Sequence, residues 1–436
     1  MTFSFKQKWG LLFLLFLTIA YVILYFVLNA PKKNEISEIY FADRITAAHR
    51  ILIQKYNELH KGKVRVVPID FPNPDFSTND RKEMLARLLR GRGDGIDIFA
   101  VDPIWVQRFA KWSEPLNKYF SENDIKKIKS SALNSCYFEG ELYSVPLVMV
   151  YGILYYRDDL LQKNKNYAHI IETLNGDITY EDFIRLKNEL GLNNPYYIFT
   201  GADYEGLICV YMELLLSLNR NYFEEHSFNF NTAEAEEALQ TLVDLINKNK
   251  ISPKIVTGLT EVPSYQYFIK NDGIFLRGWP SYDKDFVESP IDSIKEKYLK
   301  KAPLPYLKNG IPTSIFGGWN LMISKFSSKK ELAIDFAKFL LSDESQEIFY
   351  NKSGHYPVIN SFYNSKKYID KYPEILKAIE YMKTATHRPA NVDYTKYSKI
   401  LAHYINSALE MKMTVKQALS ECTNAIQNDK VMLKEF

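Results

Sequence analysis

The sequence contains few of the residues that hold metals or carry redox chemistry. Only three of its 436 residues are cysteines, namely Cys136, Cys209 and Cys422, so they cannot all pair within the chain. None lies in a C-x-x-C pair, and no two histidines have the i, i+4 spacing that places both on one helix face. We therefore predict no metal site and no cofactor, and we expect the cysteines to be buried as small hydrophobic residues.

Motifs of common enzyme classes are also absent. The chain has no G-x-S-x-G, H-E-x-x-H or G-x-x-x-x-G-K-[ST] sequence. The glycine-rich run 91–95 is predicted to be a turn, because it follows an expected helix and precedes an expected strand, the reverse of a phosphate loop. Acid pairs such as Asp94 and Asp97 could serve a glycosidase, but acids are common near turns. The sequence thus predicts a protein that is not an enzyme.

An excess of charge is missing over most of the length. The formal net charge is +3, and residues 1–35 already account for it with four lysines and one glutamate. The remaining residues are neutral as a whole. A neutral body has no field that would concentrate a polyanion, so we expect no nucleic-acid partner.

One long uncharged apolar run is present, from Gly10 to Leu28. As a helix rising about 1.5 Å per residue it would reach roughly 28 Å, close to the hydrocarbon thickness of a bilayer. Two lysines precede the run, whereas the two that follow are diluted by acids, so the positive-inside rule favours a cytoplasmic N-terminus. We predict a single-pass anchor and linker in residues 1–35, in the cytoplasmic membrane, and an extracytoplasmic body of residues 36–436.

A cleaved signal peptide is the alternative for this segment. The run is longer than the usual apolar region of about 7 to 15 residues, and the only small residue near its end is Ala30, followed by Pro31. No cysteine lies near the end of the run, so lipid attachment is not expected there. The retained anchor is therefore the favoured hypothesis.

Beyond residue 36 the apolar pattern alternates between strands and helices. Residues 38–41, 64–69 and 96–101 have the composition of strands, and residues 46–60 and 80–89 that of helices. Longer helices are predicted at residues 205–218, 232–248, 328–341, 342–351, 393–410 and 414–428. The stretch 145–156 exceeds a mean strand, so we expect it to pass from one sheet to another. The pattern predicts an α/β fold with a parallel sheet, and the length predicts two domains.

Aromatic residues recur at turns beside glycine or proline. The examples are Tyr151-Gly152, Tyr204-Glu205-Gly206, Gly278-Trp279-Pro280 and Gly317-Gly318-Trp319-Asn320. Turns at strand ends are where ligand contacts collect in α/β sheets, and an indole ring can lie flat against the C–H face of a sugar. Each aromatic could instead be a core residue, but the adjacent glycines favour a ligand role for Trp279 and Trp319.

Four blocks of sequence, in this order, carry a resemblance to a known family. They are GIDIFAVDPIWVQRFAKWSEPLNKYF, FEGELYSVPLVMVYGILYYRDDLL, FIKNDGIFLRGWPSY and IFGGWNLMISKFSSKKELAIDFAKFLLSDESQEIFYNKSGHYPVINSFY, followed by a closing segment, RPANVDYTKYSKILAHYINSALEMKMTVKQAL. The chain resembles the extracellular solute-binding protein family of ABC importers that includes the maltose- and trehalose-binding proteins. The resemblance covers about residues 36 to 430.

This resemblance implies a two-lobe periplasmic-binding-protein-like fold of type II, with a hinge and a cleft between the lobes. One lobe would comprise residues 36–149 and 314–357, and the other residues 150–313 and 358–436. The chain would cross between them near residues 145–156, 312–316 and 356–359. The implied function is capture of a sugar, for an ABC permease in the membrane, by a monomer whose lobes close on the ligand.

The resemblance also transfers a set of ligand-binding positions onto this sequence. They are Asp43, Arg44, Asp102, Trp105, Tyr151, Tyr204, Glu205, Trp279, Tyr282, Trp319, Asn320, Arg388 and Tyr397. Because the anchor is unusual for a free binding protein, a membrane-tethered sugar sensor stays open as an alternative. An anchored glycan-processing enzyme is a further alternative, which would require paired acids in the cleft.

Overall fold

The structure of the protein, a computed structural model, describes residues 5–28, 36–71, 78–91, 95–286 and 294–428. The apolar run lies in helix α1 (Phe5–Leu28). Among the described residues, no helix combines the length and the apolar composition that crossing a membrane requires. Most of the predicted linker, residues 32–35, lies outside the described part of the chain.

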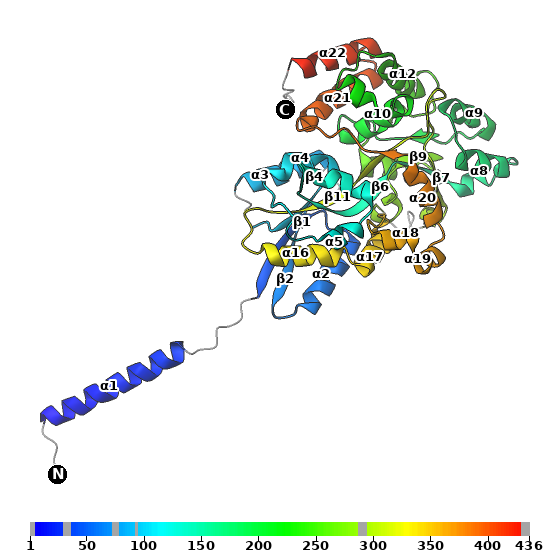
Figure 1. Cartoon of the computed structure of the whole chain (residues 1–436). Helices are drawn as coiled ribbons and strands as arrows, with labels where there is room; N and C mark the ends of the chain where they lie inside the picture. Colours follow the sequence, from blue (N-terminus) through cyan, green and yellow to red (C-terminus); the bar gives the residue numbers. More distant parts are fainter. Residues whose placement is uncertain (1–4, 29–35, 72–77, 92–94, 287–293, 429–436) are drawn as a thin grey trace.

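A mixed six-stranded sheet forms one half of the body (Figure 1). Its strands are β1 (Ser37–Asp43), β2 (Val64–Asp70), β3 (Ile98–Val101), β6 (Val145–Tyr151), β11 (Ser314–Ile323) and β12 (Ala385–Thr386). Strand β1 pairs in parallel with β2 and β3, as the helices between these strands predict. Strand β11 runs antiparallel to β3 and β6, so the expectation of a parallel sheet holds only for part of it.

Side chains of this sheet alternate between two hydrophobic clusters, one on each face. Phe41 and Ile98 pack with helices α2 (Ala47–Leu59), α16 (Lys330–Leu340) and α17 (Asp343–Ser353). Phe99 and Val101 pack on the other face with α3 (Thr78–Arg90) and α4 (Val106–Ala110). Because successive residues of a strand point to opposite faces, the apolar run 96–101 fills both clusters at once.

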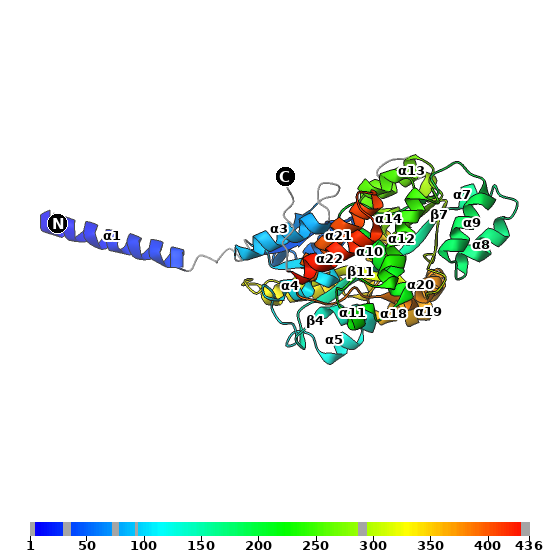
Figure 2. The same cartoon turned by 90° about the horizontal axis from the view of Figure 1, so that it is seen from above.

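A four-stranded sheet forms the other half, in the order β10 (Leu299–Ala302), β7 (Ile153–Arg157), β9 (Phe275–Gly278) and β8 (Tyr197–Ile198). Helices α10 (Glu205–Leu218), α12 (Ala233–Asn247), α21 (Tyr394–Leu409) and α22 (Val415–Gln427) pack together beside it (Figure 2). The sequence predicted each of these helices to within about two residues. Thr232 caps α12 and Thr414 caps α22, so local side chains set where both helices begin.

The remaining described elements are short or peripheral. They are β4 (Tyr137–Phe138) and β5 (Glu141–Leu142), the helices α5 (Glu122–Lys126), α6 (Ser130–Leu133), α7 (Asp158–Leu161), α8 (Tyr167–Asn175), α9 (Tyr180–Leu190), α11 (Tyr222–His226), α13 (Glu261–Lys270), α14 (Tyr282–Asp285), α18 (Asn360–Asn364), α19 (Lys366–Lys371) and α20 (Ile375–Lys383), and the 3-10 turns η1 (Pro103–Trp105), η2 (Asn134–Cys136) and η3 (Lys254–Gly258).

The long stretch 145–156 passes from one sheet to the other, as the sequence predicted, and it divides at Gly152, a short way past the predicted boundary between residues 149 and 150. Strand β6 belongs to the six-stranded sheet and β7 to the four-stranded sheet, so the chain passes between the sheets at this residue. A Cβ atom on Gly152 would lie 2.1 Å from Glu213 Oε1, which is far too close. Glycine is therefore required at the crossing because a buried carboxylate occupies the space of a side chain.

Candidate functional site

A cavity lies between the two sheets and is lined from both sides. Arg44 and Asp102 follow β1 and β3 at the carboxyl edge of the parallel strands, where ligand sites of α/β sheets collect. Trp279 follows β9 of the four-stranded sheet, and Glu205 begins α10. The lining residues are Arg44, Arg81, Asp102, Val150, Glu205, Gly206, Cys209, Thr260, Glu261, Val262, Pro263, Trp279, Ser281, Gly317, Gly318, Trp319, His355 and Arg388.

Arg388 joins the two sides of this cavity. One of its terminal nitrogens donates to Asp102 Oδ1 at 2.5 Å, and the other donates to Glu205 Oε1 at 2.8 Å. The Tyr394 hydroxyl donates to the same Glu205 oxygen at 2.6 Å. Burial by itself would lower the pKa of Arg388, but the charge of Asp102 and its other neighbours raises it well above its usual value. This guanidinium is therefore held as a charged bridge between the two sheets.

A second arginine, Arg81, lies over the ring of Trp319 at 3.9 Å from the ring centroid. It forms an ion pair with Asp43, which also faces His49 Nε2 at 3.3 Å. Burial raises the pKa of Asp43, but the hydrogen bond from His49 and the charge of Arg81 outweigh burial and lower it. Asp43 thus lies behind the cavity wall and positions the arginine that covers Trp319.

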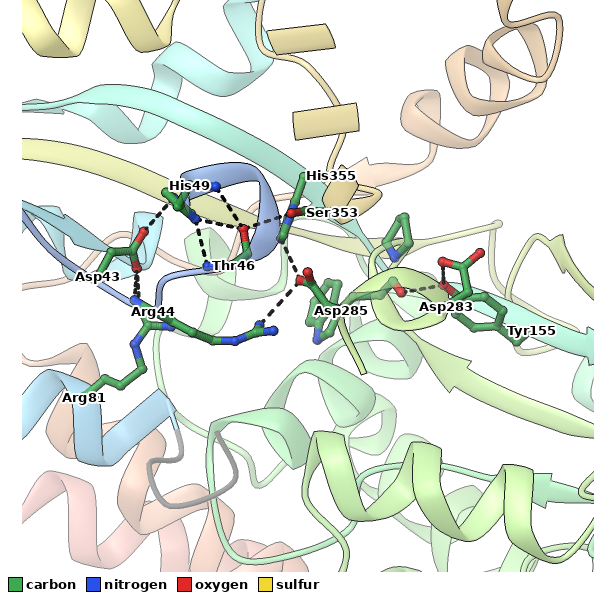
Figure 3. Close-up of polar contacts among 12 residues, drawn as sticks. Asp43, Arg44, Thr46, His49, Arg81, Tyr155, Asp283, Asp285, Ser353 and His355 are labelled. Carbon is green, nitrogen blue, oxygen red and sulfur yellow. Dashed lines mark hydrogen bonds and ion pairs between the residues drawn. The ribbon is translucent and has the colours of Figure 1, made fainter. Parts of the chain in front are cut away.

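Another ion pair, between Arg44 and Asp285, crosses between the two sides of the cavity (Figure 3). Asp285 is the last residue of α14. Arg44 Nη1 lies 3.4 Å from Asp285 Oδ2, and His355 Nε2 lies 3.7 Å from the same oxygen. Burial raises the pKa of Asp285 to about 6. Burial, together with the charges of Arg44 and His49, lowers the pKa of His355 to about 3. At neutral pH this imidazole is therefore uncharged.

A fourth arginine supports the other tryptophan. The guanidinium of Arg277 lies 4.1 Å from the ring centroid of Trp279 and makes two hydrogen bonds to Glu213, at 2.6 and 3.1 Å. Arg277 is fully buried, and Glu213 Oε1 also accepts from the backbone N–H of Ile315. This ion pair fixes the tryptophan at the point where the chain crosses between the sheets.

The arginines around the cavity share one property. Each has a carboxylate partner, so none presents an uncompensated positive charge to a ligand. Glu261 lines the same cavity, but its side chain has no ion pair among the described residues. Burial raises the pKa of Glu261, although the neighbouring Tyr204 and Arg277 act in the opposite direction. The cavity is therefore polar and aromatic, without a surplus of positive charge.

Cleavage chemistry has little support in this arrangement. Cys209 is the cysteine of the cavity wall, and burial raises its pKa to about 12, so it stays a protonated thiol. In the described part of the chain, no group of three or more potential ligands could hold a metal ion. Asp102 and Glu205 already share the guanidinium of Arg388. The geometry is suited to binding by aromatic faces and fixed polar groups.

The structure brings together six of the thirteen predicted site residues. The six that line the cavity are Arg44, Asp102, Glu205, Trp279, Trp319 and Arg388. The other seven lie outside the lining. Asp43 holds Arg81, as described above, and Asn320 is buried and donates to Ser135 Oγ at 3.1 Å.

Four of the five aromatic members of the second group pack against other apolar or aromatic groups. Tyr151 stacks on Tyr356, and Tyr282 is buried and stacked parallel to Tyr155. Trp105 lies in a hydrophobic cluster, and Tyr397 lies against Phe228. Tyr204 is also buried, but its ring lies beside Gly206, which lines the cavity. A contact with ligand stays a prediction for all seven.

Several cavity residues were not predicted from the sequence. Arg81 lies on α3, where its local sequence resembles that of any exposed helix. Glu261 begins α13, and an acid in a first helical turn is usually explained by the helix dipole. His355 directly follows Gly354 at the edge of the predicted crossing 356–359, so its position beside a glycine turn was a usable signal. Thr260 and Ser281 carried no distinctive signal.

Comparisons with known proteins identify the family of this chain. A family model described as bacterial extracellular solute-binding protein matches residues 41–347. A probable ABC transporter-binding protein of Deinococcus radiodurans is 26% identical over 366 residues, which are 81% of this chain and 85% of that protein.

Solved structures show the same fold. The maltose-bound MalE3 of T. maritima has a TM-score of 0.80 and 26% identity, covering 90% of this chain and 99% of its own. The Listeria monocytogenes substrate-binding protein Lmo0181, in complex with cycloalternan, has a TM-score of 0.73 and 19% identity, covering 91% of this chain and 99% of its own.

The family model covers well over half of the chain, and the MalE3-like α/β fold extends over nearly all of it. The resemblance inferred from the sequence blocks is thereby confirmed. The protein belongs to the bacterial extracellular solute-binding proteins, a family that binds its solutes and does not transform them.

Proposed function

We propose that this protein is the substrate-binding component of an ABC importer, which captures an oligosaccharide or another sugar in the cavity between its two sheets. The observation that carries the proposal is that Trp279 and Trp319 line one cavity whose arginines all have carboxylate partners. An indole face suits the C–H face of a sugar ring, and neutralised arginines can donate to hydroxyl oxygens without demanding an anion.

Unpartnered donors support a ligand rich in oxygen. The Nε atoms of Arg81 and Arg388 are buried and have no hydrogen-bond partner, and both residues line the cavity. Buried donors that stay unpaired cost free energy, so this proposal requires that a bound sugar, with the accompanying adjustment of these side chains, supplies hydroxyl oxygens to them. The maltose in the MalE3 structure and the cycloalternan in the Lmo0181 structure are ligands of this class.

We further propose that the two sheets belong to lobes that close on the ligand. Residues 36–149 and 314–357 would form one lobe, and residues 150–313 and 358–436 the other. Strands β1, β2, β3 and β11 come from the first set of residues and β7 to β10 from the second, which supports this division. Strand β6 extends past the proposed boundary to Tyr151, and the short strand β12 of the second set pairs with β11. The contacts of Arg388 with Asp102 and of Arg44 with Asp285 then cross between lobes. Such contacts, together with the ligand, would stabilise the closed form that a permease recognises.

Residues 1–35 would tether this receptor to the outer face of the cytoplasmic membrane. The support comes from the uncharged run between Gly10 and Leu28 and from the lysines that precede it. A short tether raises the effective concentration of the receptor near a membrane permease to about the millimolar scale. Extraction of membranes with carbonate should leave the protein in the pellet, whereas its release would exclude a retained anchor.

A thermal-shift panel on the full-length chain tests the sugar proposal. Neutral mono- and oligosaccharides should raise the unfolding midpoint, because a ligand at 100 times its Kd adds about 2.7 kcal/mol of stability. Amino acids, inorganic phosphate and polyamines serve as the comparison set. If no saccharide raises the midpoint while a member of the comparison set does, the proposed ligand class is wrong.

A further inference from the structure

The carboxylate of Glu213 lies where the chain crosses between the two sheets. Its Oε1 atom accepts a hydrogen bond from the backbone N–H of Ile315 at 3.3 Å, at the start of β11. The backbone N–H of Gly152, at the crossing between β6 and β7, donates to the carbonyl of Ile315 at 3.1 Å. A Cβ atom on Gly152 would meet the same Oε1 atom. One buried carboxylate therefore contacts both crossing segments at once.

Arg277 connects this carboxylate to the cavity. Its Nη2 and Nε atoms donate to the two oxygens of Glu213 at 2.6 and 3.1 Å, and its guanidinium covers one face of Trp279. Because the guanidinium is planar, paired hydrogen bonds to a carboxylate fix its orientation as well as its position. Trp279 is only partly buried and lines the cavity, so a ligand can reach the ring from there.

Trp279 also lies against the crossing strand itself. A Cβ atom on Gly317 would be 3.6 Å from both Cη2 and Cζ3 of the indole, so the edge of the ring lies over this glycine. Ile315 and Gly317 belong to β11, which continues into the six-stranded sheet, whereas Trp279 follows β9 of the four-stranded sheet. A rotation of one sheet relative to the other must therefore change the contacts at Ile315 and Gly317.

Arg277 keeps its charge although it is fully buried. Burial lowers its pKa, but the charge and the hydrogen bonds of Glu213 raise it above the usual value. A buried ion pair gives little net stability compared with apolar side chains of the same volume, so stability alone gives little reason for one here. The distinctive property of this pair is the fixed geometry that it sets between Trp279 and the backbone of β11.

We propose that Arg277 and Glu213 are positioning residues that couple a ligand on Trp279 to the closure of the lobes. This inference rests on the proposed sugar binding and lobe closure, and it specifies how the first produces the second. A sugar ring stacked on Trp279 holds the indole against the guanidinium of Arg277. The two hydrogen bonds to Glu213 then set the position of the Ile315 N–H, and with it the direction in which β11 leaves the four-stranded half. The ligand thereby stabilises the crossing geometry of the closed form.

Arg277→Lys tests the coupling, because a lysine keeps the charge beside Glu213 but cannot bond both of its oxygens and cover the indole. The matched control is Arg157→Lys in β7 of the same sheet. Arg157 is also buried and pairs with Asp159 and Asp272, at 2.7 and 3.0 Å, at the end of β7 that lies away from the crossing. The two substitutions thus change the same type of side chain in the same sheet, beside the crossing and away from it.

Binding and closure are measured separately on the full-length protein. The probes are maltose and the neutral saccharide that gives the largest shift in the thermal-shift panel, titrated calorimetrically. Spin labels at Lys61→Cys and Lys163→Cys, on opposite sides of the cavity, report the separation of the lobes at saturating probe. Arg277→Lys should lower the affinity about tenfold, since it exchanges paired charged hydrogen bonds for a single one. At saturation, its share of molecules with the longer, open distance should be about tenfold larger than in Arg157→Lys.

A purely structural role of Arg277 predicts a different result. It would lower the unfolding midpoint of Arg277→Lys but leave the lobes closed at saturation, and this outcome refutes the coupling while retaining the sugar function. Glu213→Gln is the second variant, because it keeps an oxygen for the Ile315 N–H but loses the charge that fixes Arg277. It should show the same incomplete closure, and complete closure in this variant also refutes the coupling. If no saccharide of the panel binds the unchanged protein, both proposals are wrong.

Discussion

The contact between Arg388 and Asp102 should hold the two lobes together before any ligand binds. We predict that Asp102→Asn shifts the ligand-free protein toward the open form. The substitution is conservative, because an asparagine can still accept from the backbone N–H of Ile104, as Asp102 does at 3.1 Å. It can also still accept from Arg388, whose charge remains compensated by Glu205. What is lost is the charge of one partner in a buried hydrogen bond of 2.5 Å.

The size of this effect follows from the kind of hydrogen bond that is replaced. Hydrogen bonds to charged groups contribute about 1.5 to 3 kcal/mol and neutral ones about 0.5 to 1.5 kcal/mol. The closed form should therefore lose about 1 to 2 kcal/mol relative to the open form. The ratio of closed to open molecules falls about 5- to 30-fold for this change. Because Glu205 and Arg388 lie on the same lobe in the proposed division, they stay paired in both forms.

Distances between spin labels on opposite lobes measure this shift without a ligand. Lys61 and Lys163 are exposed on the two sides and are suitable for labelling after replacement by cysteine, since the three native cysteines are buried. Asp283→Asn is the matched control, because Asp283 pairs with Lys301 and Tyr155 on its own side of the cavity. If Asp102→Asn and Asp283→Asn give the same distribution of distances between the two labels, the contact between Arg388 and Asp102 does not stabilise the closed form.

Three other predictions concern affinity, stability and pH. Trp279→Ala combined with Trp319→Ala should weaken saccharide binding by at least about tenfold in calorimetric titration, since each ring contributes apolar area and a stacking face; full retention of affinity would refute stacking. Glu213→Gln should lower the free energy of unfolding by about 3 kcal/mol, because it leaves the buried Arg277 without a counter-charge, and a midpoint within one degree of the unchanged protein would contradict this. Asp285→Asn should make the unfolding midpoint fall more steeply between about pH 6 and pH 4. The raised pKa of Asp285 means that the folded protein takes up this proton before the unfolded chain does, which adds stability as the pH falls by at most about 1.4 kcal/mol per pH unit. The lowered pKa of His355 removes stability as the pH falls, and in Asp285→Asn no proton uptake by Asp285 offsets this loss. Parallel profiles of midpoint against pH for Asp285→Asn and the unchanged protein would contradict the assignment.

Much of the secondary structure was predictable because its determinants are local. Thr232 and Ser342 cap α12 and α17 through hydrogen bonds to residues three positions later, and both starts are visible in the sequence. The passage between sheets within residues 145–156 was predictable for a related reason, because a stretch of twelve residues with strand composition is too long for one strand. Its position at Gly152 came from the structure, since the sequence had placed the boundary between residues 149 and 150.

The candidate site was predictable only in part. Trp279 and Trp319 were identified from their glycine neighbours, and both line the cavity. Tyr151 has the same kind of neighbourhood, beside Gly152, but is buried in a stacked pair with Tyr356. An aromatic ring at a turn beside glycine can face a ligand cavity or pack on another aromatic ring. The local sequence is the same in both cases, so it does not distinguish them.

The sequence by itself determined the α/β alternation, the long helices with their caps, a crossing within residues 145–156 and the two tryptophans of the cavity, because each depends on residues within a few positions. Only the tertiary structure decided how the charges pair. Arg388 meets Asp102 across 286 residues, and Arg44 meets Asp285 across 241. The packing of the two sheets against each other decides which carboxylate neutralises each arginine. It also leaves Glu261 without an ion pair in the described part of the chain. Such pairing leaves no periodic trace in the sequence, since a charged side chain has the same local neighbours whether its partner is near or absent.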